Sequence, residues 1–258
     1  MNNFFSRLFG CFAHTRFPTP IQNFINSVYV AIFSIDLSEF ESTSYPTLNA
    51  LFTRKLKHNR IFDGSANVLI SPSDSLITEL GVSKEKKALQ IKGMQYSVEE
   101  LLGETLSKEM FYINLYLSPK DYHRYHAPCD LEIMELRYFG GDLMPVNMPS
   151  LHKNAHLFIR NERVVLKAKM PNQKILYFVA VGALNVGSII FHCEPKIQTN
   201  ARRYNETYAY ASPKKVRKGE ELGMFQMGST IVLFIEDFTP SIKSAEEVKF
   251  AQSIGFLA

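Results

Sequence analysis

After about residue 62, the chain alternates short apolar runs with turn residues, which is the pattern of β-strands. The runs are rich in β-branched and aromatic residues and are separated by glycine, proline or asparagine. They are Val68–Ile70, Phe111–Leu117, Leu131–Leu136, Leu157–Ile159, Val164–Ala168, Leu176–Val181 and Ile231–Ile235. One short helix is expected at Ser97–Leu102, because Ser97 can cap it and Glu100 stands three residues further on. The pattern predicts an α+β fold with a mostly antiparallel β core.

The first 40 residues show helical spacing instead. One apolar stripe is formed by Phe4, Phe5, Leu8, Phe9 and Phe12. A second begins at Thr19-Pro20, a cap followed by a proline, and continues through Ile21, Phe24, Ile25, Val28, Tyr29, Ile32 and Phe33. The longest unbroken apolar run, Val28–Phe33, is far short of the roughly 20 residues that span a bilayer. We therefore expect residues 1–40 to form amphipathic helices. For 1–15 we favour the membrane interface; for 19–36 packing on the core or on a second subunit stays equally open.

The composition is that of an ordinary globular protein. The 258 residues are 46% apolar and 21% charged, enough for one β-rich catalytic domain at 41–258. The net charge of +4 suits an anionic membrane surface but is too small to indicate nucleic acid. A basic cluster interleaved with tyrosines (Arg202, Arg203, Lys214, Lys215, Arg217 and Lys218) is taken as a solvated loop or headgroup patch. The cysteines Cys11, Cys129 and Cys193 fit a reducing compartment, and no spacing predicts a metal site.

Near the C-terminus, Gly228-Ser229-Thr230 directly precedes the apolar run Ile231–Ile235. This placement predicts a serine exposed at a strand edge. Because glycine has no Cβ, the Ser229 hydroxyl could approach the Gly228 carbonyl carbon and turn the amide into an ester. Elimination would then give dehydroalanine, and its hydrolysis would release ammonia and leave an N-terminal pyruvoyl group. Alone, the tripeptide is common turn composition.

A nucleophilic serine needs a base, and the base needs an orienting group. The segment Tyr122–Pro128 supplies His123 and His126, and Asp74 follows the apolar residues Leu69-Ile70 in a turn. Asp74, His126 and Ser229 are thus the three chemical types of a serine-activating triad. They are far apart in sequence and can meet only in the fold.

Taken together, the motifs resemble the bacterial, pyruvoyl-dependent phosphatidylserine decarboxylases, in family order over roughly 180 residues. They are Phe52–Lys57, Ser71–Asp74, Ile91–Gly103, Tyr122–Pro128, Gly141–Leu143, Asn161–Val165, Val181–Ala183, Val186–Ile189 and Gly228–Thr230. Two positions depart from the family: Ser75 replaces a glycine and Met227 a leucine. Ser75 puts the turn geometry in question if that position needs a positive φ. Lys218–Phe225 is also similar to the turn of lipoyl and biotinyl carriers, which suggests a sandwich-like or half-barrel-like core.

The resemblance implies that Asp74, His126 and Ser229 carry out self-cleavage between Gly228 and Ser229. The products would be a β chain, 1–228, and an α chain, 229–258, held together as a heterodimer. The pyruvoyl group made from Ser229 would form a Schiff base with phosphatidylserine, release CO2 and yield phosphatidylethanolamine. His123 would donate the proton or position the carboxylate, with a purely structural histidine as the alternative.

The resemblance also implies a peripheral location on the cytoplasmic side of the cell membrane, and it leaves a homodimer open. Two other classes of function remain. A serine hydrolase could use the same three residues on an external ester, although the Gly-x-Ser-x-Gly elbow is absent around Ser229. A catalytically silent membrane-binding relative is conceivable because of Ser75.

Overall fold

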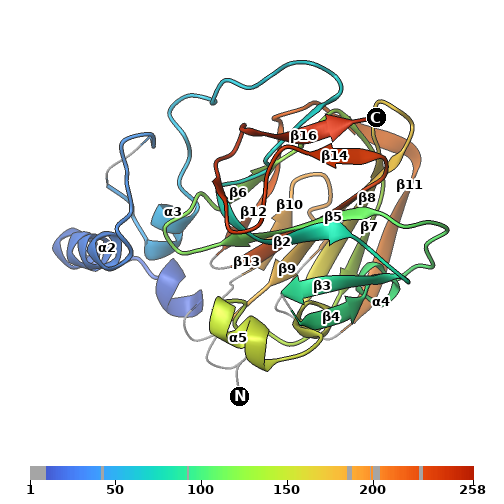
Figure 1. Cartoon of the computed structure of the whole chain (residues 1–258). Coiled ribbons are helices and arrows are strands. Elements are labelled where there is room, and N and C mark those ends of the chain that lie inside the picture. Colours follow the sequence, from blue (N-terminus) through green and yellow to red (C-terminus); the bar gives the residue numbers. More distant parts are fainter. Residues whose placement is uncertain are drawn as a thin grey trace.

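A computed structural model of the chain describes residues 10–41, 44–91, 93–184, 188–197, 199, 204–226 and 229–258 (Figure 1). The helices are α2 (Thr19–Phe33), α3 (Leu48–Phe52), α4 (Val98–Leu102), α5 (Met148–Lys153) and α6 (Leu157–Arg160). The strands are β1 (Val68–Ile70), β2 (Ser75–Val82), β3 (Lys87–Ile91), β4 (Met94–Ser97), β5 (Phe111–Leu117), β6 (Arg124–His126), β7 (Leu131–Phe139), β8 (Arg163–Lys169), β9 (Ile175–Gly182), β10 (Ser188–Phe191), β11 (Asn205–Val216), β12 (Glu221–Gln226), β13 (Ser229–Ile235), β14 (Phe238–Pro240), β15 (Glu247–Val248) and β16 (Ser253–Leu257).

An eight-stranded sheet, in the order β11-β7-β8-β9-β13-β5-β2-β15, forms the body of the molecule. The sheet β10-β12-β6 packs against one of its faces, while β1-β16-β14 and the hairpin β3-β4 complete the body (Figure 1). All pairings between these strands are antiparallel. The expected α+β class with a mostly antiparallel core is therefore confirmed.

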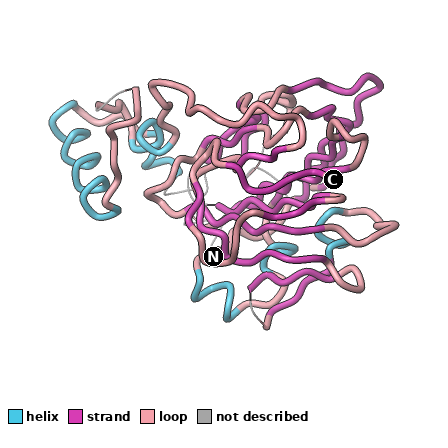
Figure 2. Tube along the Cα trace, turned by 45° about the horizontal axis from the view of Figure 1, so that its top comes forward, coloured by secondary structure: helices cyan, strands magenta, loops and turns pink. Residues whose placement is uncertain are grey.

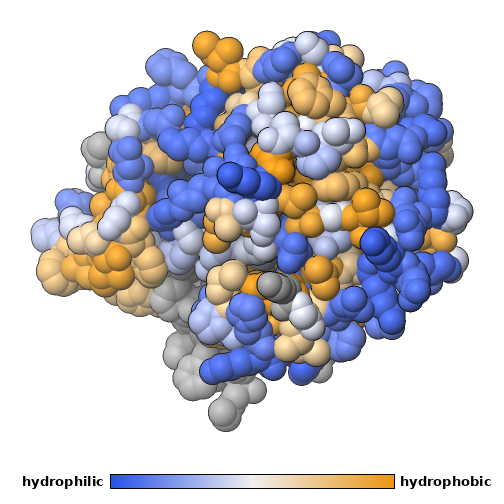
Figure 3. All heavy atoms as spheres, in the orientation of Figure 1, coloured by the Kyte–Doolittle hydropathy of each residue, from blue (hydrophilic) through white to orange (hydrophobic). Residues whose placement is uncertain are grey.

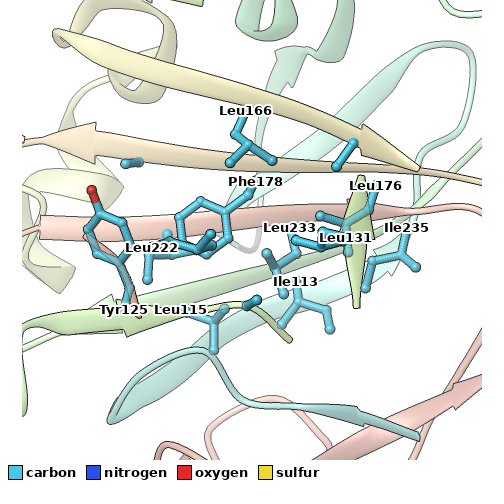
Figure 4. Packing of buried hydrophobic residues seen from close by; sticks show 14 of the residues in the cluster. Ile113, Leu115, Tyr125, Leu131, Leu166, Leu176, Phe178, Leu222, Leu233 and Ile235 are labelled. Atoms are coloured by element: carbon cyan, nitrogen blue, oxygen red, sulfur yellow. The ribbon is translucent and has the colours of Figure 1, made fainter. Parts of the chain in front are cut away.

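Strand β13 lies at the centre of the large sheet and is buried on both faces. Ile231, Leu233 and Ile235 belong to one hydrophobic cluster, and Val232 and Phe234 to a second. This split follows from the alternation of side chains along a strand. The first cluster includes Tyr125 and Leu222 of the small sheet, which project towards Phe178 and Leu233 of the large one (Figure 4). The two sheets are thereby fixed against each other.

The N-terminal helices lie to one side of the β body (Figure 2). Helix α2 has Pro18 at its N-cap, so Thr19 is its first residue rather than its cap, and it ends at Phe33 because Ser34 adopts a left-handed conformation with φ 52°. Its buried residues are polar: Gln22 donates to Asn26 over 2.9 Å, and Asn26 donates to the Tyr45 carbonyl over 2.8 Å. Of the described helices, none is long and apolar enough to cross a membrane.

Two local predictions have different outcomes. Ser97 caps α4 and accepts the Glu100 amide hydrogen over 3.2 Å, as expected. The run Leu157–Ile159 is a short helix, so the predicted strand is wrong there. Its first amide, that of Leu157, is bound by the Gln90 side chain at 2.7 Å, a contact across 67 residues that local propensity cannot anticipate.

Candidate active site

Ser229 is the first residue of β13 and is flanked on both sides by other strands. It pairs with Leu117 at the end of β5 and with Gly182 at the end of β9. Paired residues of neighbouring strands point to the same face of a sheet, so the Ser229 side chain shares a face with that of Leu117. Leu117 belongs to the hydrophobic cluster that includes residues of the small sheet, so this is the face that the small sheet covers. The residue is fully buried, so the prediction of an exposed serine is wrong, although its place at a strand end is right. Its Oγ has no hydrogen-bond partner among the described residues. Gly228 lies outside the described residues.

His126 belongs to β6, in the small sheet over that face. Its backbone amide donates to the Pro72 carbonyl over 2.9 Å, which places β6 beside the turn that carries Asp74. The imidazole Nδ1 lies 2.9 Å from the Gly219 carbonyl oxygen, and Nε2 lies 3.0 Å from the Tyr122 hydroxyl. Because a carbonyl oxygen can only accept, Nδ1 carries the proton and Nε2 is the basic nitrogen.

His123 is also held through a backbone carbonyl at Nδ1, and its side chain is more deeply buried than that of His126. Its Nδ1 donates to the Asp121 carbonyl over 2.9 Å, and its ring centroid lies 3.9 Å from that of Phe52. Its Nε2 is buried and has no partner within the described part of the chain. Burial lowers the pKa of His123 to about 3 and that of His126 to about 4. Both imidazoles are therefore neutral at pH 7.

Asp74 lies in the predicted turn between β1 and β2. Its carboxylate accepts two hydrogen bonds from Arg60, at 2.5 and 3.1 Å, and one from the Phe250 amide at 2.8 Å. The Phe250 ring stacks on His126, with centroids 3.8 Å apart and planes 18° apart. Both His126 nitrogens are hydrogen-bonded to other groups, so Asp74 does not bind the imidazole directly. It is linked to the imidazole through Phe250, whose amide it binds and whose ring stacks on His126. The orienting role of Asp74 in self-cleavage stays a prediction.

Ser75, the residue that departs from the family, begins strand β2. It is not among the residues with positive φ, so this turn does not need a glycine for its backbone conformation. This removes the structural reason given for a catalytically silent protein.

Sequence reasoning did not single out several residues of this site. Arg60 and Phe250 stand outside the motifs that supplied the triad, and nothing in their spacing indicates their partners. Tyr122 opens the histidine motif and Gly219 is a turn glycine of Lys218–Phe225, so these two residues do carry a sequence signal. A cavity of about 580 Å³ adjoins the site and is lined by, among others, Glu39, Asp74 and Lys249.

Asn161 fixes the strand end opposite Ser229. Its Nδ2 donates to the carbonyls of Gly182 and Met144, both over 2.8 Å, and its Oδ1 accepts the Met144 amide hydrogen over 3.1 Å. Every one of these groups is buried. The amide thus ties the end of β9 to the segment before α5, next to the strand position that Ser229 faces.

Comparison with known proteins identifies the family of the chain. The family model described as phosphatidylserine decarboxylase matches residues 48–256. A phosphatidylserine decarboxylase proenzyme of Helicobacter pylori is 57% identical over 99% of this chain and 97% of its own length. One from Campylobacter jejuni is 45% identical over 96% and 97%, and a mitochondrial one from Cricetulus griseus is 32% identical over 98% and 71%.

These findings define the protein as a decarboxylase proenzyme, that is, a carboxy-lyase made as a precursor. The chain belongs to the phosphatidylserine decarboxylase family. The resemblance seen in the motifs is thereby confirmed, and so is the prediction of an enzyme of this class. The serine hydrolase and the silent relative are not favoured.

Proposed function

We propose that the chain cuts itself between Gly228 and Ser229 and then decarboxylates phosphatidylserine to phosphatidylethanolamine. One observation carries the proposal: the Ser229 hydroxyl is buried, has no partner among the described residues, and lies on the sheet face covered by the small sheet. Strand β6 of that sheet carries His126 and directly follows His123, and both imidazoles are neutral. An unpaired buried hydroxyl is costly to maintain, which favours a chemical role for it. The proenzyme names of the relatives support the same reading.

In the proposed self-cleavage, His126 is the base. Only Nε2 has an electron pair that can accept a proton, because Nδ1 donates to the Gly219 carbonyl. Nε2 must therefore give up its hydrogen bond with the Tyr122 hydroxyl and accept one from the Ser229 hydroxyl instead. Ser229 Oγ then bonds to the Gly228 carbonyl carbon, and the amide nitrogen of Ser229 takes up the proton as the C–N bond breaks. Removal of the Ser229 α-proton expels the Gly228 carboxylate and leaves dehydroalanine. Water replaces its nitrogen, which leaves as ammonia, and a pyruvoyl group remains at 229.

That pyruvoyl carbonyl would supply the electron sink that the loss of CO2 from an amino acid requires. The residues around Ser229 fit a small group at this place, because Gly182 faces it without a side chain. His123 presents only Nε2, since its Nδ1 proton is engaged by Asp121. A substrate carboxylate next to Nε2 would raise the pKa of His123, so the imidazole would take up a proton on binding. That proton would then serve the carbon that loses CO2.

The two fragments are expected to stay together as a heterodimer after cleavage. The small fragment, 229–258, contains the central strand β13, paired with β5 and β9 along all seven residues. The five apolar residues Ile231–Ile235 are fully buried, and burial stabilises by about 1.5–3 kcal/mol for each. Their sum, roughly 7–15 kcal/mol, is comparable with the stability of a whole domain.

Helix α2 supports attachment to a membrane surface. Its polar residues Gln22 and Asn26 face the body, whereas four apolar side chains point outward and form an orange patch over α2 (Figure 3). They are Ile21, Phe24, Val28 and Ile32, with exposures of 50, 70, 40 and 68%. A soluble helix normally has the opposite orientation. The alternative that the apolar residues of this helix pack on the chain's own core holds only for its opposite face, where Ile25 and Tyr29 are partly buried.

The cleavage proposal is tested by the intact mass of the purified protein. Wild type should give fragments of 228 and 258 − 228 = 30 residues, the smaller carrying a ketone that borohydride reduces. Ser229→Ala should stay one chain. A full-length wild type that still decarboxylates phosphatidylserine would refute the proposal. Reaction of the intact chain with a serine-directed phosphonate would favour the hydrolase.

The membrane proposal is tested by flotation with vesicles that contain phosphatidylserine. The double variant Phe24→Asp, Ile32→Asp should lose binding, because charge on this face opposes burial in the lipid interface. Ile61→Asp is the matched control, since Ile61 is 99% exposed but belongs to the segment between α3 and β1 rather than to α2. Unchanged flotation of the α2 variant would contradict the assignment. A change in oligomeric state alone would identify the face as a contact between two copies.

A further inference from the structure

Arg60 joins Asp74 to two other parts of the molecule. All five of its N–H groups are used: Nε and one Nη2 hydrogen on Glu39, at 3.3 and 2.8 Å, and one hydrogen from each Nη on Asp74. The remaining Nη1 hydrogen points to the Phe250 carbonyl at 3.4 Å. Only 13% of the Arg60 side chain and 15% of the Asp74 side chain are exposed. A planar guanidinium whose N–H groups all have acceptors holds its partners at fixed distances and in a fixed plane.

The contacts continue from Asp74 to the base. Asp74 binds the Phe250 amide and Arg60 its carbonyl, so the backbone of this residue is held on both sides. The Phe250 ring then stacks on the His126 imidazole. Phe250 belongs to the 229–258 fragment, whereas the other three residues belong to 1–228, so the contacts also span the proposed cut.

We propose that Arg60 is a positioning residue for self-cleavage: by fixing Asp74 and Phe250, it sets the plane of the His126 ring against Ser229. This inference rests on the proposed function and adds to it a residue outside the triad. Arg60 acts through its partners and takes no part in the bond changes. Glu39 completes its outer half, so loss of Glu39 should have a smaller effect than loss of Arg60.

The test follows cleavage of freshly translated chains in a cell-free system, scored as the half-time for release of the 30-residue fragment. Arg60→Ala should lengthen the half-time at least tenfold, because Asp74 and the Phe250 backbone lose their restraint and the stacked Phe250 ring no longer holds the imidazole in one plane. Arg60→Lys and Glu39→Gln should give intermediate values. Millimolar methylguanidinium should shorten the half-time of Arg60→Ala, since the cavity beside Asp74 gives it access; equal sodium chloride should not.

Arg137→Ala is the matched control. Arg137 is 12% exposed and pairs with Glu104 and Glu135, so its loss removes a similar ion-paired guanidinium that makes no contact with the site residues. It should cleave with the wild-type half-time. Melting of each substitution in the Ser229→Ala background shows whether the fold survives, and if Arg60→Ala does not fold, Arg60→Lys decides.

Cleavage of the folded Arg60 variants within twofold of wild type overturns the inference. So does a slow Arg60→Ala that methylguanidinium leaves slow, because a purely structural loss would not respond to the missing group. Wild type serves as the internal reference. If it cleaves and the variants cleave equally fast, only the role of Arg60 falls; if it never cleaves, the proposed function falls as well.

Discussion

A methyl group at Gly219 is the sharpest perturbation of the base that the structure offers. Gly219 has φ +76°, and its carbonyl oxygen accepts the Nδ1 proton of His126. A Cβ added there would lie 2.6 Å from Cε1 of Phe62. Gly219→Ala therefore strains the backbone and pushes on a neighbouring ring at the residue that orients His126.

The magnitude follows from these two effects. A left-handed conformation costs a residue with a Cβ roughly 1–2 kcal/mol. Ordinary contact begins at 3.4 Å, so the ring or the backbone must move by about 3.4 − 2.6 = 0.8 Å; overpacking of this kind costs about 1–3 kcal/mol. We expect a total loss of about 2–5 kcal/mol in the free energy of unfolding. Where the backbone moves, the carbonyl moves with it, and a shift of about 1 Å can slow the reaction up to 100-fold.

The assay is the half-time of fragment release, together with urea unfolding in the Ser229→Ala background. Gly93→Ala is the control for backbone strain, because Gly93 has φ +85° but nothing within 4 Å of the added Cβ. It should lose about 1–2 kcal/mol and cleave normally. Phe62→Leu combined with Gly219→Ala should recover part of the rate. A Gly219→Ala chain that cleaves like wild type would refute the role of this carbonyl.

Three further predictions concern the same site. Burial lowers the pKa of His126 to about 4, so at pH values between 4 and 6.5 this residue binds a proton in the unfolded chain but not in the folded one. Lowering the pH from 7 to 5 should therefore reduce the free energy of unfolding by about 2 kcal/mol through this residue. Urea unfolding should show a shallower pH dependence for His126→Asn, and equal slopes would contradict this. Tyr122→Phe should cleave about fivefold faster, since His126 no longer has to release a hydrogen bond worth about 1 kcal/mol; slower cleavage in the same time course would show that the hydroxyl assists. Asn161→Ala should lose about 3–5 kcal/mol, because the backbone groups of Met144 and the Gly182 carbonyl lose their partner; a loss below about 1 kcal/mol in urea would show that the loop repairs itself.

The sequence alone determined the features that depend on neighbouring residues. Side-chain alternation and β-branched runs located five of the eight strands of the large sheet, namely β5, β7, β8, β9 and β13, together with β1, and Ser97 marked the start of α4. They missed the long edge strand β11 and all three strands of the small sheet. The collinear motifs were sufficient for the family, and the types of residue at 74, 126 and 229 indicated the chemistry. These signals are local, since they arise from periodicity, capping and functional groups that can be identified along the chain.

Only the tertiary structure decided the environment of those groups. It buried Ser229 by placing β5, β9 and the small sheet around it, and it made Leu157–Arg160 a helix through a contact from Gln90. It also set the proton on Nδ1 of His126 with a carbonyl 93 residues away. The exposure, tautomer and pKa of a side chain depend on which segments surround it in the fold. These segments are far apart in the sequence, so a pattern of neighbouring residues cannot specify the contacts between them.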